Sequence, residues 1–162
     1  MIYDNSHVRR QDRLLDMGRA LELLRTSEYG VLSMTDADGH AYGVPVNYVW
    51  DGVSSIYIHC APEGRKLRCL ASCPEVSFCI VGSTRVVPGK FTASYESILL
   101  SCRAFTGLSE DERRRALAVF LEKYSPEHLE TGLNYVEKSF HRTEIIRLDV
   151  ATVSGKCKRV MP

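Results

Sequence analysis

The sequence predicts a mainly β fold: a six-stranded antiparallel barrel with helices on its outside. Six segments have the composition of β-strands, and most consecutive strands are joined by turns too short for parallel crossovers. We expect the strands to close into a barrel, because closure removes exposed strand edges. With 162 residues, 44% of them hydrophobic, the chain is large enough for one domain, 1–162, in which 1–12 is a loose N-terminal segment.

The first half of the chain predicts one helix and then a β-meander. Asp16 is placed to cap the helix, which is expected to end near Thr26. The apolar residues of this helix recur with helical spacing, at Leu14, Met17, Leu21 and Leu24. Three strand-like runs follow, at residues 29–35, 41–50 and 55–60. The turns between them, Asp36–Gly39 and Asp51-Gly52, are short enough for antiparallel pairing.

The second half of the chain alternates helices and strands. The expected strands cover residues 76–81, 95–105 and 144–153. The expected helices cover residues 65–72, 129–140 and a segment that runs from Ser109 to just before Pro126. Ser109 begins a capping box of the form S-x-x-E at the start of the longest of these helices. Pro74 stops the short helix at 65–72. Residues 83–92, which include Pro88 and Gly89, are expected to form a loop.

Composition and motifs exclude several classes of function. A net charge of +1 provides no basic field for nucleic acid. No apolar run approaches the roughly 18 residues of a membrane span, and the polar N-terminus lacks a signal-peptide core, so we expect a cytoplasmic protein. Nucleotide-binding, zincin and α/β-hydrolase motifs are absent. The six cysteines are expected to be free thiols, with Cys79 and Cys102 as small buried hydrophobes, although the spacing of Cys69 and Cys73 would also allow a metal.

The run Val44–Tyr48 is a candidate for contact with a planar polar ligand. Pro45 lies inside this strand-like run and has no N–H, so the strand is bulged or has a free edge there. Backbone groups of Val44, Val46 and Tyr48 would then be available to the edge of a planar ring. The alternative is an ordinary edge strand without a ligand.

The segment His59–Lys66 is a candidate anion site. A helix begins near Gly64, and the unpaired amides and positive dipole end of a helix start attract an anion. Arg65 and Lys66 add two cations, and Gly64 permits close approach of a phosphate. His59 precedes this start and is suited to contact a ligand or to move a proton. A solvated basic turn and a hydrogen-bonded structural histidine are the alternatives.

Together these segments resemble a known family. YGVPVNYVWDG at 42–52, IYIHCAPEGRKL at 56–67, VSFCIVG at 76–82 and TASYESILLSCRA at 92–104 are similar to the nitroimidazole-resistance (Nim) branch of the pyridoxamine-5'-phosphate-oxidase-like, FMN-binding split barrels. The resemblance extends from about Arg9 to Lys158. It implies a six-stranded split barrel and a homodimer with two FMN sites at its interface.

The resemblance also implies which residues hold the FMN. Along the isoalloxazine edge it places Val44, Pro45, Val46, Asn47 and Tyr48. Beneath the ribityl chain or ring it places His59, Cys60 and Ala61. To the phosphate it assigns Gly64, Arg65 and Lys66, with Arg65 standing where many relatives carry His. On the long strand that approaches the dimer interface and the flavin it places Tyr95, Glu96 and Ser97.

The resulting hypothesis is an FMN-dependent oxidoreductase. A reduced nicotinamide or another donor would reduce the FMN, which would then reduce a small acceptor such as a nitroaromatic or a quinone. His59 and Tyr95 are the candidate catalytic residues, because they are suited to position the acceptor, and no metal site is expected. Two alternatives stay open: a non-catalytic flavin or haem carrier or sensor with His59 as axial ligand, and a pyridoxal-phosphate-type oxidase. For the oxidase, the chain shows no C-terminal Arg/Trp pocket.

Overall fold

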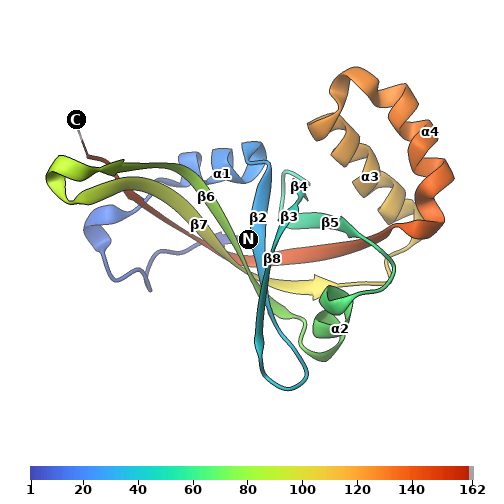
Figure 1. Ribbon diagram of the computed structural model, residues 1–162, viewed down its shortest axis with the longest axis horizontal. Helices are drawn as coiled ribbons and strands as arrows, with labels where there is room; N and C mark the ends of the chain where they lie inside the picture. The colour runs from blue at the N-terminus through green and yellow to red at the C-terminus, as the bar shows by residue number, and fades with distance from the viewer. Residues whose placement is uncertain (161–162) are drawn as a thin grey trace.

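The computed structural model describes residues 1–160, which form one curled β-sheet with helices around it (Figure 1). Its strands are β1 (Ile2–Tyr3), β2 (Tyr29–Thr35), β3 (Ala41–Asn47), β4 (Val49–Trp50), β5 (Ser55–Cys60), β6 (Glu75–Val87), β7 (Thr92–Phe105) and β8 (Glu144–Lys158). Its α-helices are α1 (Met17–Thr26), α2 (Arg65–Ser72), α3 (Glu110–Tyr124) and α4 (Leu129–Ser139). Short 3-10 turns lie at Gln11–Arg13, Pro88–Lys90, Pro126–His128 and Phe140–Arg142. None of the helices between residues 1 and 160 has the length and apolar content needed to cross a bilayer.

The sheet closes because the two ends of its strand order are neighbours in sequence. Its hydrogen-bonded order is β3-β2-β6-β7-β8-β5-β4, all antiparallel, and β1 joins β8 in parallel. Only Tyr48 separates β3 from β4, so the sheet must curl back on itself. The mainly β class with a split barrel is therefore confirmed. The expected count of six strands is wrong among the described residues, because β1 adds one strand and the run 41–50 breaks into two.

The expected loop at 83–92 is in fact the end of a long hairpin arm. β6 and β7 stay paired out to Val87 and Thr92, and the arm projects to the left of the barrel in Figure 1. The register shifts between Val81 and Thr84, a β-bulge that uses Gly82 without ending the ladder. Pro88 begins the 3-10 turn at the tip. Glycine and proline were therefore correct signs of irregular backbone, but here they mark a bulge and a tip within a strand pair.

The N-terminal segment is tied to the barrel and is not loose as expected. Ile2 and Tyr3 pair with β8, and the Tyr3 hydroxyl donates to the Leu15 carbonyl at 2.5 Å. The Gly155 amide donates to the Asn5 side chain at 2.9 Å. β8 continues past Val153, the end that the sequence predicts, because β7 stays paired with it as far as Lys158.

The barrel interior is filled by branched aliphatic and aromatic side chains, and α1 covers one opening. Asp16 caps α1 as expected, accepting a hydrogen bond from the Arg19 amide at 2.8 Å. The predicted apolar stripe of α1 is only partly right, because Met17 is exposed and the buried face is Ala20, Leu23 and Leu24. Fully buried barrel residues include Leu32, Ile56, Ile58, Phe78, Ile80, Ile98, Leu100, Ile146 and Leu148.

Helices α3 and α4 form a hairpin that stands over one end of the barrel, at the upper right of Figure 1. Ser109 caps α3 by accepting from the Glu112 amide at 3.3 Å. Gly132 lets α4 approach closely, since a Cβ there would lie 2.6 Å from Leu121. A second small core, distinct from the barrel interior, packs the hairpin against β8; it consists of Ala116, Leu117, Val136 and Phe140 with Ile145 of β8.

Candidate functional site

Strand β3 has the free edge that Pro45 predicts. Among residues 1–160 it pairs only with β2, where Pro45 lies opposite Val31, and no described strand pairs with its other edge. Val44 and Val46 pack against the barrel core, whereas Pro45 and Asn47 are exposed. A proline nitrogen that faces this open edge removes no hydrogen bond between β2 and β3.

Tyr48, which breaks the run into β3 and β4, is held by α3. Its ring is fully buried, and its hydroxyl donates to the Leu24 carbonyl at 2.7 Å. Its amide donates to the Tyr124 hydroxyl at 3.2 Å, and its carbonyl accepts from Lys123 at 3.1 Å and Tyr124 at 2.7 Å. Burial lowers the pKa of Lys123 to about 8, and the nearby Glu28 opposes this. Tyr48 therefore fixes the strand break, and its backbone groups are already paired within the chain.

The start of α2 carries two cations, of which Arg65 has partners within the chain and Lys66 has none among residues 1–160. Gly64 precedes the helix with φ 149°, a conformation that favours glycine. The Arg65 guanidinium lies 4.3 Å from the ring centroid of Tyr42 and 3.4 Å from an oxygen of Asp36. Lys66 is half-buried and makes no hydrogen bond or ion pair with any residue between 1 and 160. Of the two predicted phosphate ligands, Lys66 is thus the one free to take an anion.

His59 lies near the end of β5, close to Lys66. It pairs with Ile145 of β8, and its ring meets the Phe120 ring edge-to-face with centroids 4.9 Å apart. The residue is exposed overall, but burial of the ring and then the charge of Lys66 lower its pKa, which favours neutral imidazole. Cys60, next in the strand, is half-buried, and burial raises the pKa of its thiol. Ala61 is exposed at the strand end.

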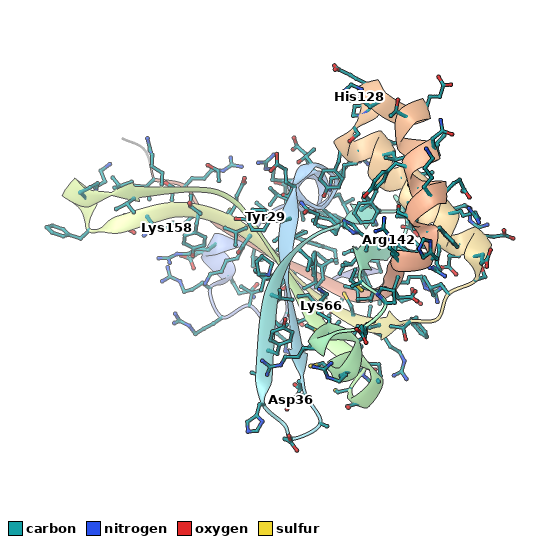
Figure 2. All side chains as sticks on the ribbon, turned by 45° about the vertical axis from the view of Figure 1, so that its right-hand side comes forward. Tyr29, Asp36, Lys66, His128, Arg142 and Lys158 are labelled. Atoms are coloured by element: carbon teal, nitrogen blue, oxygen red, sulfur yellow. The ribbon has the colours of Figure 1, made fainter. Side chains whose placement is uncertain are left out.

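A cavity of about 610 Å³ lies between this end of the barrel and the helical hairpin. Figure 2 marks Arg142 where α4 returns to the barrel, and Lys66 beside α2. The lining residues are Asn47, His59, Leu117, Phe120, Leu121, Tyr124, Ser125, Tyr135, Val136, Ser139, Arg142 and Thr143. Asn47 and His59 belong to the predicted site, and the cavity brings them together. The helical wall was not predicted as part of a site, because its helical spacing is the same as that of a core stripe.

Tyr95, Glu96 and Ser97 lie far from His59 within one chain. Tyr95 pairs with Lys158 of β8, thirteen residues along the strand from the partner of His59, which is roughly 40 Å of extended chain. Glu96 is held by Arg19 of α1, whose guanidinium donates at 2.5 and 3.0 Å. The predicted site is therefore divided into two groups at opposite ends of the sheet.

The cysteines are all free, as expected. Cys102 is buried, and burial raises its pKa to about 12. Cys79 is only half-buried, so its assignment to the core is wrong. Among residues 1–160, the one group of side chains spaced for a metal is Asp36, Asp38 and His40 in an exposed turn, and it includes neither Cys69 nor Cys73.

Several solved structures share this fold. A candidate 5-nitroimidazole antibiotic resistance protein from Bacteroides thetaiotaomicron superposes with a TM-score of 0.72 and 19% identity, over 90% of this chain and 86% of that chain. The flavocytochrome Anf3 from Azotobacter vinelandii superposes with a TM-score of 0.79 and 19% identity, over 98% of this chain and 76% of that chain. An FAD and heme binding protein from Mycobacterium smegmatis superposes with a TM-score of 0.74 and 18% identity, over 91% of this chain and 73% of that chain. At these identities the similarity establishes the fold alone.

Sequence comparison identifies the family directly. No curated protein matches the chain. A family model described as pyridoxamine 5'-phosphate oxidase matches residues 16–157. This range includes β2 to β7 in full and β8 up to its last residue but one, and it leaves out β1. The family resemblance in the motifs is therefore confirmed, and this chain belongs to the pyridoxamine 5'-phosphate oxidase family.

Proposed function

We propose that the protein is an FMN-dependent oxidoreductase that passes electrons from a reduced nicotinamide to a small acceptor such as a nitroaromatic or a quinone. One observation carries the proposal: an uncommitted Lys66 beside Gly64 at a helix start, next to His59, in a chain of this family. A phosphate fits there because the first amides of α2 and the Lys66 ammonium can donate to the same group.

The surrounding backbone fits the rest of the cofactor. The free edge of β3 at Val44–Asn47 offers amides and carbonyls to the polar edge of an isoalloxazine ring. His59, Cys60 and Ala61 extend from the barrel towards the start of α2, which suits a ribityl chain between ring and phosphate. FMN supplies the redox chemistry when bound, and these residues supply binding and orientation.

We further propose a homodimer, in which the partner completes the site. The outer sheet face between the barrel and the arm has two uncharged cross-strand rows, Ser33-Ser77-Ser101-Thr152 and Val31-Cys79-Leu99-Ser154. Leu99 is 51% exposed at its centre, and the charged pair Glu75–Arg103 lies at its rim. A centre without charged residues and a polar rim are typical of protein interfaces. A second copy on this face is the means by which Tyr95 and Ser97 reach a His59.

In this arrangement His59 and Tyr95 position the acceptor, as the family resemblance implies. The neutral His59 imidazole offers one N–H donor and one acceptor nitrogen. Asn47 donates to the Glu28 carbonyl at 2.9 Å through its amide nitrogen, which fixes the side chain and leaves its oxygen able to accept. Both groups line the same cavity, so an acceptor there meets two fixed polar contacts.

The test is the absorbance spectrum of the purified protein, followed by release and mass analysis of the flavin. We expect the visible absorbance of an oxidised flavin cofactor, and a mass that identifies FMN rather than FAD. Oxidation of NADH or NADPH should then depend on added menadione or nitrobenzene. Colourless protein that fails to take up FMN would refute the proposal, and release of FAD would correct the cofactor.

A second candidate is a non-catalytic flavin or haem carrier. It is favoured by the apolar helical wall of the cavity, with the His59 imidazole at one side, and by relatives that are a flavocytochrome and an FAD and heme binding protein. A Soret band that appears on haem addition and is lost in His59→Ala supports this candidate. Sustained turnover of NADH with an acceptor, and no haem binding, excludes it.

A further inference from the structure

The cavity beside His59 has an unbalanced charge. Two of its lining residues are basic, His59 and Arg142, and none of the residues from 1 to 160 that line it carries a carboxylate. His59 favours the neutral form, because burial and the nearby Lys66 both disfavour its protonation. Arg142 is therefore the permanent charge of the cavity wall, and it is positive.

Arg142 has no partner, in contrast to its neighbours on the hairpin. Arg113 and Arg114 both stack on Phe140, Arg113 donates to the carbonyls of Phe140 and Thr143, and Arg114 pairs with Glu137. Within residues 1–160, Arg142 makes no side-chain hydrogen bond, ion pair or ring contact. It lies just beyond α4, where the chain returns to the barrel, and faces the cavity that it lines (Figure 2).

The remaining wall of the cavity is aromatic. Phe120 and Tyr124, one turn apart on α3, have stacked rings with centroids 5.9 Å apart and planes inclined by 21°. His59 meets the edge of Phe120 from the barrel side. Tyr135 lines the cavity from α4 and is 66% exposed, so its ring is accessible to a ligand in the cavity. Nearly parallel rings on one wall and a further ring on the other suit a flat ligand.

We infer that this cavity binds a planar aromatic carboxylate, with Arg142 paired to the carboxylate and the ring held by Phe120, Tyr124 and Tyr135. The inference rests on the proposed function in one respect, because it gives the electron acceptor a ring and a negative charge. An arginine fork matches the two oxygens of a carboxylate, so a neutral analogue of the same shape binds less tightly.

The probes are 4-nitrobenzoate and its neutral analogue 4-nitrobenzamide, titrated calorimetrically into the protein as purified. We expect the wild type to bind 4-nitrobenzoate about three- to fivefold more tightly, which is the upper part of the range for an ion pair at an exposed arginine. Arg142→Gln should abolish this preference and leave the affinity for 4-nitrobenzamide unchanged. Arg115→Gln is the matched control, because Arg115 is an exposed arginine of the same hairpin that does not line the cavity.

The outcomes separate this inference from the proposed function. Equal affinity for the two probes, or a preference that survives in Arg142→Gln, overturns the inference. A preference lost in Arg142→Gln supports it, even if the protein reduces neither probe, in which case the proposed reductase fails alone. Because Arg142 is exposed and unpartnered, Arg142→Gln should keep the thermal midpoint of the wild type, and a Tyr135→Ala variant should weaken both probes equally.

Discussion

Lys66 and Arg65 are adjacent in sequence but should differ sharply when substituted. Arg65 is engaged with Asp36 and the ring of Tyr42, whereas Lys66 is half-buried and unpaired. We therefore expect Lys66→Met to release flavin and Arg65→Met to retain it, with both chains folded. Methionine keeps the apolar part of each side chain and removes only the charge, so packing contributes little to the difference.

The size of the effect follows from the surroundings of Lys66. A hydrogen bond to a charged group contributes about 1.5–3 kcal/mol, and the partial exposure of Lys66 favours the lower end of this range. Loss of about 1.5–2 kcal/mol raises the Kd for FMN roughly 10- to 30-fold. Arg65→Met should change the Kd less than about threefold, because surface ion pairs contribute about 0–1 kcal/mol. Substitution of both residues should match Lys66→Met alone.

A second measurement reports on Lys66 without any flavin. The Lys66 charge is the smaller of the two causes that lower the His59 pKa, so Lys66→Met should raise that pKa by a part of its depression. NMR titration of the imidazole measures the change in flavin-free protein, and Arg65→Met should leave the value unchanged. Fluorescence titration with FMN gives the Kd of each variant.

Two results would refute this reasoning. If Arg65→Met weakens FMN binding as much as Lys66→Met, Arg65 binds the phosphate in spite of its contact with Asp36. If Lys66→Met raises the His59 pKa but leaves FMN bound with unchanged Kd, Lys66 lies beside His59 and the phosphate binds elsewhere.

Three further predictions concern the barrel and the arm. Gly30→Ala places a Cβ 2.5 Å from the fully buried Phe78 ring, so chemical denaturation should show a loss of about 1–3 kcal/mol. Glu96→Gln removes the carboxylate that Arg19 binds and should lower stability by about 1 kcal/mol at pH 7. Because Arg19 lowers the Glu96 pKa, this stabilisation is present above the unfolded value of 4.5, and the gap between wild type and variant should close as the pH falls through the folded pKa. Leu99→Lys puts a charge at the centre of the uncharged sheet face and should give monomers by light scattering with little change in thermal midpoint, since Leu99 is half exposed; a stable dimer would place the interface elsewhere.

The elements that could be predicted are those with local boundaries. The strands 29–35 and 55–60 and the helix 65–72 occur with the expected limits, because short turns or a Gly and a Pro mark both ends. β1 and the end of β8 could not be predicted, because their pairing partners are distant in sequence. The two strands of the arm are neighbours in sequence, but they were missed for another reason. Local composition at 83–92 favours a loop, and only the paired strand overrides it.

Prediction of the site was limited by the same cause. Residues 59–66 are contiguous, so the hypothesis of an anion site there needs only one segment of the sequence. Asn47 and His59 meet only because the sheet curls, and family resemblance indicated this where local pattern did not. Phe120 of α3 is buried as a core residue would be, but it also lines the cavity. A helical stripe alone does not distinguish a residue packed against protein from one that borders a ligand.

The position of β8 in the sheet has a consequence for synthesis of the protein. β8 is the last of the described strands in chain order, yet it lies between β7 and β5 in the sheet. No other strand pairs with both β7 and β5 among the described residues. Without residues 144–158, this strand order leaves two groups, β3-β2-β6-β7 and β5-β4, each with an open edge. Open edges of this kind recruit other strands, so a pause in translation before Glu144 exposes the chain to misassembly. Release of the final fifteen-residue strand joins both groups in a single step.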